Sequence, residues 1–62
     1  MAYTVIWYGK QGILEKTPFD AEKVARDHLL ETFGDRKLRD GVVSAEVRKE
    51  DGTVVFSQAG GN

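Results

Sequence analysis

The chain has 62 residues, which is enough for one domain. Its composition, with 40% hydrophobic and 31% charged residues, is typical of a soluble globular protein. The formal net charge of −1 disfavours a general nucleic-acid coat, and no apolar run approaches the ~18 residues of a membrane span, so we expect no membrane partner. The absence of cysteine excludes a disulfide framework and fits a reducing cytoplasm, where we expect the protein.

The N-terminal part of the chain predicts a β-hairpin. Residues 3–8, YTVIWY, are β-branched and aromatic and form the first predicted strand. Gly9-Lys10-Gln11-Gly12 predicts a turn, and residues 13–17 return as the second strand. Both faces of the first strand are apolar, which is typical of a strand inside a sheet. Pairing Tyr8 with Ile13 sets the register, and we expect the following residues beneath a helix: Tyr3, Val5, Trp7 and Leu14.

A helix is predicted over residues 19–34, FDAEKVARDHLLETFG. Asp20 can cap its first turn, because the carboxylate can accept from free backbone N–H groups there. Thr17 followed by Pro18 is a competing start. Gly34 can adopt the left-handed conformation that ends a helix. At 100° per residue, one side of this helix carries the residues expected to pack on the sheet: Ala21, Val24, Ala25, His28, Leu29, Thr32 and Phe33.

The C-terminal part predicts a second hairpin. Residues 35–40, DRKLRD, are expected to form a charged loop, followed by strands over residues 42–49 and 53–57. Asp51-Gly52 between the strands predicts a type I′ turn, which needs positive φ at both central residues. The resulting register pairs Val47 with Phe56 and places these residues on the core face: Val43, Ala45, Val47, Val54 and Phe56.

Together the elements predict an α+β fold of ββαββ order in one domain over residues 1–58, with a flexible tail over residues 59–62. The expected sheet is four-stranded, antiparallel or mixed, with the helix packed on one face. A right-handed crossover after the second strand and a central first strand favour the strand order 2-1-4-3, the minimal β-grasp arrangement. The expected core consists of Trp7, Leu29, Phe33, Val47 and Phe56.

Two glycine motifs resemble functional segments of known families. Gly9-Lys10-Gln11-Gly12 is similar to the G-x-x-G loop with which KH domains clamp nucleic acid, although a hairpin turn is the simpler interpretation. Gly60-Gly61 resembles the ending of ubiquitin-like sulfur carriers, small β-grasp proteins that are activated at a terminal di-glycine. That resemblance implies a sulfur carrier whose reactive end is exposed by removal of Asn62.

Residues that could serve in acid–base catalysis or metal binding are scarce. His28 is the only histidine, and it lies in the apolar stripe of the predicted helix, which favours a packing role over acid–base catalysis. One histidine without cysteine gives no metal-ligand set, and no acidic loop of the calcium-binding type is present. We therefore expect a protein that is not an enzyme and that binds no cofactor.

The sheet face opposite the helix is the most informative surface. Ile6, Tyr8, Ile13, Val42 and Val55 are predicted to lie there. Leu30 points outward from the helix. A contiguous apolar patch on a small protein usually marks a partner surface. We therefore expect an interaction domain that forms a homodimer through sheet faces or edges, or binds another protein.

Single-stranded nucleic-acid binding is the alternative function. Arg36, Lys37 and Arg39 form a short basic cluster, and Arg48 is predicted beside Tyr8 on the uncovered face. An aromatic side chain with basic neighbours on an open sheet is a common arrangement for holding single-stranded RNA. These four basic residues are also candidates for contact with a phosphate or an acidic partner.

Overall fold

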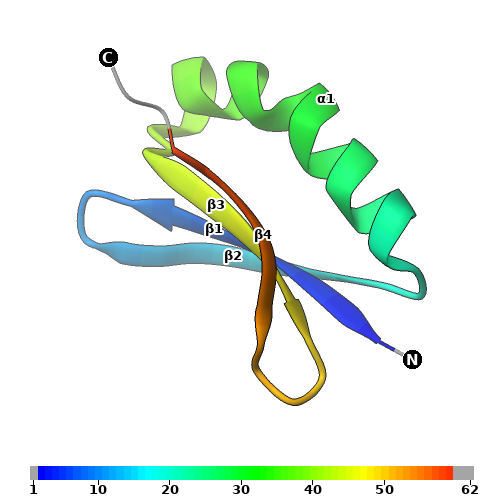
Figure 1. Ribbon diagram of the computed structural model, residues 1–62. Coiled ribbons are helices and arrows are strands. Elements are labelled where there is room, and N and C mark those ends of the chain that lie inside the picture. Colours follow the sequence, from blue (N-terminus) through cyan, green and yellow to red (C-terminus); the bar gives the residue numbers. More distant parts are fainter. Residues whose placement is uncertain (1, 60–62) are drawn as a thin grey trace.

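Two β-hairpins flank one helix in the computed structural model, which describes residues 2–59 (Figure 1). The helix lies across one face of the sheet that the hairpins form. In chain order the elements are β1 (Tyr3–Gly9), β2 (Gly12–Phe19), α1 (Glu22–Asp40), β3 (Ser44–Lys49) and β4 (Val54–Ala59).

The strands of the described residues form one four-stranded sheet of order β2-β1-β3-β4, and every neighbouring pair is antiparallel. The predicted α+β class is confirmed, but the predicted order 2-1-4-3 is wrong. That order needs a parallel β1–β4 pair, whereas placing β3 beside β1 makes every pair antiparallel, and parallel pairing is slightly less stable per residue. Sulfur carriers of the ubiquitin-like kind are β-grasp proteins, and the observed strand order differs from the β-grasp arrangement. Residues 60–62, including Gly60-Gly61, lie outside the described residues.

The first hairpin contains a β-bulge that changes its register. Tyr8 pairs with Ile13 as predicted, but Trp7 then pairs with Glu15, so Leu14 is the extra residue on β2. Leu14 packs against Gly9, where an added Cβ would lie 3.0 Å from the leucine side chain. The prediction that Leu14 lies in the core is wrong, because about half of this residue stays exposed. The bulge also places Glu15 opposite Trp7, on the helix side of the sheet.

The second hairpin is bulged as well. Val47 pairs with Phe56 as predicted, but Arg48 pairs with Val54, which leaves Val55 as the extra residue. The predicted type I′ turn is wrong, because Gly52 has a φ of 93° and no non-glycine residue in the described part has a positive φ. The Gly52 N–H instead donates to the Lys49 carbonyl at 2.9 Å, and the Lys49 N–H donates to the Thr53 carbonyl at 2.9 Å.

The bulge on β4 also alters which residues face the core. Val54 was predicted on the core face. It pairs with Arg48, which follows the core residue Val47 in β3 and therefore points to the opposite face, so Val54 lies on the uncovered side. Val55 was predicted on the uncovered face, yet it is partly buried against the core. Both corrections follow from one extra residue, which moves side chains to the other face of a strand.

Helix α1 is longer than predicted. Its N-cap is Ala21, without a side-chain capping bond, so neither Asp20 nor Thr17 caps it. The predicted end at Gly34 and the predicted loop over residues 35–40 are both wrong, because the helix continues to Asp40. Gly41 ends it with a φ of 74° and donates its N–H to the carbonyl of Arg36. Arginine, lysine and leucine in DRKLRD are good helix formers, whereas one interior glycine costs only about 1 kcal/mol.

The core lies between α1 and the two central strands, β1 and β3. Of the predicted core residues, Trp7, Leu29, Phe33 and Val47 are buried together, and Phe56 packs against them partly exposed. The prediction for Val42 is wrong, because it precedes β3 and turns into the core instead of following the strand's alternation. The buried cluster consists of Val5, Trp7, Ala25, Leu29, Phe33, Val42, Ala45 and Val47.

Candidate interaction surface

The sheet face opposite α1, here called the open face, follows from the strand register. Residues that alternate with Val5 and Trp7 in β1, and with Ala45 and Val47 in β3, point away from the helix. Three predicted members, Ile6, Tyr8 and Ile13, lie on this face. The open face comprises Thr4, Ile6, Tyr8, Ile13, Lys16, Pro18, Ser44, Glu46, Arg48, Val54, Ser57 and Ala59.

A polar network occupies the middle of the open face. The Tyr8 hydroxyl donates to Oε2 of Glu46 at 2.6 Å, and Nε of Arg48 donates to the same oxygen at 2.5 Å. The hydrogen bond to Glu46 raises the pKa of Tyr8, and burial and the carboxylate charge add to the rise. Glu46 was not among the predicted site residues, although its position between Ala45 and Val47 in an alternating strand marks it for this face. The carboxylate therefore pairs with Arg48, the predicted phosphate contact on this face, and also bonds the Tyr8 hydroxyl.

The apolar part of the open face is divided. Ile6 is only 7% exposed and therefore offers little apolar surface to a partner. The large exposed apolar residues of this face are Ile13 on β2 and Val54 on β4, with 53% and 45% of each exposed. These strands form the two edges of the sheet, and the network around Glu46 lies between them. The open face is therefore apolar toward its edges and polar at its centre.

Leu30 lies on the other side of the sheet, on a flank of α1. The Arg26 guanidinium is 5.5 Å from the ring centroid of Phe56, so this flank faces β4. Leu30 follows Arg26 by one helical turn and therefore lies on the same flank. About half of Leu30, 51%, is exposed. Leu30 thus belongs to the helix side of the β4 edge and not to the open face.

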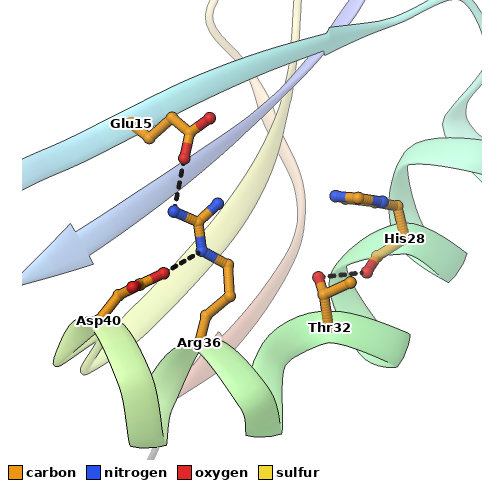
Figure 2. A network of polar contacts seen from close by, with 5 residues as sticks. All are labelled: Glu15, His28, Thr32, Arg36 and Asp40. Atoms are coloured by element: carbon orange, nitrogen blue, oxygen red, sulfur yellow. Dashed lines mark hydrogen bonds and ion pairs between the residues drawn. The ribbon is translucent and has the colours of Figure 1, made fainter.

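The predicted basic cluster is separated in the structure. Arg36, Lys37 and Arg39 lie in the last turns of α1, whereas Arg48 lies on the opposite face of the sheet. Arg36 turns inward, where its Nη2 donates to Glu15 at 2.5 Å and its Nε donates to Asp40 at 3.1 Å (Figure 2). Lys37 and Arg39 are exposed. The structure therefore does not gather the four residues into one phosphate site.

His28 packs among aromatic rings. Its ring centroid lies 4.9 Å from that of Phe19 and 6.3 Å from that of Trp7. Its backbone carbonyl accepts a hydrogen bond from the Thr32 hydroxyl at 2.7 Å (Figure 2). The Trp7 indole N–H is buried and has no hydrogen-bond partner within the described residues. These contacts fit the packing role that the sequence predicts for His28.

Neither a pocket nor a group of three or more potential metal ligands is found within residues 2–59. In the same residues, α1 is not apolar enough over its length to cross a membrane. No protein-family model matches the chain, and comparisons with curated proteins and with solved structures give no significant match.

Proposed function

We propose that this protein is a small non-catalytic interaction domain that associates with a second copy of itself through its sheet. The observation that carries the proposal is the one-sided packing of the sheet. Helix α1 packs on one face, while exposed apolar residues of the open face lie at its edges, Ile13 on β2 and Val54 on β4. Burial of such side chains favours association at about 25 cal/mol per Å² before the costs of ordering two molecules. A two-fold pair is the simplest assembly in which one surface covers itself.

Single-stranded nucleic-acid binding is the second candidate. Its support is Tyr8 on the open face, with Arg48 in the same network. Glu46 weakens it, because a carboxylate bonded to both residues repels the phosphate backbone and leaves Arg48 paired. Phosphate contacts supply most non-specific affinity for nucleic acid, so a neutralised cation is a poor anchor. Self-association needs no free charge and is therefore the better supported function.

Sedimentation velocity tests the proposal with the unmodified chain at roughly micromolar to millimolar concentration, a range that covers weak dimers. We expect the mass to rise from monomer to dimer across this range. A monomeric mass at every concentration would overturn the proposal. Titration with homopolymer RNA and DNA at low salt tests the second candidate, for which we expect no binding. Salt-sensitive binding that is lost in Tyr8→Ala would favour nucleic acid instead.

A further inference from the structure

The two edges of the sheet differ in chemistry. Edge strand β2 carries Glu15, Lys16 and Pro18, and charged residues and proline are the usual means by which an edge strand avoids pairing with another chain. Edge strand β4 has the sequence VVFSQA, which contains neither a charged residue nor proline. Both edges carry one bulge, at Leu14 on β2 and at Val55 on β4, so charge and proline are what distinguish them. The part of β4 that follows its bulge is therefore more open to a further strand than β2.

The backbone of β4 has groups directed outward at Ser57. Lys49 donates its N–H to the Thr53 carbonyl at 2.9 Å, which marks a hydrogen-bonded pair at the turn. Along an antiparallel ladder, pairs that exchange backbone hydrogen bonds alternate with pairs that do not. Counting from Lys49, the pair of Arg48 with Val54 is not hydrogen-bonded, Val47 bonds to the bulge opposite it, and the pair of Glu46 with Ser57 is again not hydrogen-bonded. The N–H and C=O groups of Ser57 therefore point away from β3, toward the free edge.

The helix side of the same edge is only partly covered. Phe56 is partly buried against the core, and the guanidinium of Arg26 on α1 lies over its ring. Leu30, on the same flank, is half exposed. A strand added along β4 would cover the outer side of Phe56 and approach Leu30. Apolar side chains beside an unprotected edge are the features that strand addition uses, since backbone bonds supply affinity and side chains supply specificity.

We infer that the β4 strand of a second copy pairs antiparallel with β4 near Ser57 and joins two sheets into one continuous sheet. The inference rests on the proposed self-association and narrows its surface to the β4 edge, which leaves Ile13 on the opposite edge outside the interface. Identical strands can pair antiparallel about a two-fold axis, and VVFSQA then brings no like charges together. The net charge of −1 adds little repulsion between copies. Because β2 is protected, the assembly closes at a dimer instead of growing into a fibre.

The test compares Ser57→Pro with Ser57→Ala by sedimentation velocity, with circular dichroism to confirm folding. Proline removes the outward N–H without removing a bond to β3, whereas alanine keeps it. We expect Ser57→Ala to dimerise as the unmodified chain does, and Ser57→Pro to stay monomeric at concentrations at least tenfold above the midpoint of dimerisation. A folded Ser57→Pro variant that still dimerises would overturn the β4 interface and leave self-association standing. An unmodified chain that is monomeric throughout would overturn both proposals.

A cysteine variant keeps the inference testable if Ser57→Pro does not fold. The chain has no cysteine, so Ser57→Cys introduces a single thiol. In the inferred dimer the two Ser57 residues lie close together across the axis, and oxidation should give a covalent dimer. The matched control is Ile13→Cys on β2, which should cross-link far more slowly. Equal cross-linking of the two variants, or faster cross-linking through Ile13→Cys, would overturn the β4 interface.

Discussion

The guanidinium carbon of Arg36 lies 4.7 Å from the ring centroid of Trp7, the largest fully buried side chain of the described residues. Cation–π attraction favours this placement, and the ion pairs with Glu15 and Asp40 hold the guanidinium in position (Figure 2). Only 20% of the Arg36 side chain is exposed. The contact joins β1 and β2 to the last turns of α1. The sequence predicts a loop for these last turns.

Arg36 is therefore expected to contribute more to stability than the other basic residues near it. Arg36→Ala should lower the free energy of unfolding by about 1–3 kcal/mol, because it removes charge-assisted hydrogen bonds and packing on Trp7. Arg36→Lys should recover only part of the loss, since an ammonium group cannot reproduce the planar stacking and the two directed bonds. Urea denaturation followed by tryptophan fluorescence measures the effect. Arg39→Ala, at an exposed position, is the control and should change stability by no more than about 0.5 kcal/mol. Equal losses for Arg36→Ala and Arg39→Ala would contradict the structural role.

The two phenylalanines at the helix–sheet interface should differ in their contribution to the core. Phe33 is buried, whereas Phe56 is only partly buried beneath Arg26. Phe33→Ala should cost about 3–5 kcal/mol, because it leaves a cavity between α1 and the sheet. Phe56→Ala should cost less, since part of this residue is already exposed in the folded protein. Chemical denaturation of both variants tests the order, and a larger loss for Phe56→Ala would contradict it.

Sequence periodicity predicted most of the core. The alternation of β1 and β3 and the helical spacing of Leu29 and Phe33 depend on local geometry, and the structure buries the residues that these patterns select. The errors at Leu14, Val54 and Val55 come from the bulges in β2 and β4, whereas Val42 was misplaced because it precedes β3 and does not follow the strand's alternation. A bulge is one extra residue in an otherwise regular ladder, and nothing in the alternation of either strand marks its position.

The candidate surface was less predictable than the core. Ile6 and Tyr8 were placed correctly because β1 has no extra residue. Ile13 was placed correctly because it pairs with Tyr8, before the bulge at Leu14. Val55 was misplaced by the bulge in β4. The strand order, which makes β4 an edge, depends on long-range pairing that local patterns do not encode. The contrast between the β2 and β4 edges becomes meaningful only once that order is known.

The helix end provides a matched pair of glycine substitutions. Gly34 lies inside α1, and an added Cβ there would meet nothing within 4 Å, so Gly34→Ala should stabilise the protein by about 0.5–1 kcal/mol. Gly41 has a φ of 74°, where a Cβ is strained, so Gly41→Ala should destabilise it by about 1–2 kcal/mol. Thermal or urea denaturation measures both changes. A helix that ended at Gly34 would make Gly34→Ala destabilising, so the sign at Gly34 tests whether α1 continues to Asp40.

The Tyr8–Glu46 hydrogen bond predicts a pH dependence at the centre of the open face. The Tyr8 hydroxyl donates a hydrogen bond to Glu46 at 2.6 Å, and this bond raises the pKa of Tyr8 above its ordinary value near 10. The nearby charge of Arg48 lowers this pKa, but only in part. A raised pKa means that the folded state favours the neutral phenol. The resulting stability is present below the ordinary tyrosine pKa and is lost as the pH rises through the folded pKa.

Substitution of Glu46 isolates this effect. Glu46→Gln removes the carboxylate charge and leaves Arg48 beside Tyr8, and both changes favour the phenolate. We expect the pKa of Tyr8 to fall relative to the unmodified protein, so the stability linked to its protonation should be smaller and should be lost over a narrower range of alkaline pH. An NMR titration of the tyrosine ring carbons measures the pKa, with Tyr8→Phe used to assign the signal and Ser57→Ala as a control on the same face. An unchanged Tyr8 pKa in Glu46→Gln would show that the hydrogen bond does not hold the hydroxyl in solution.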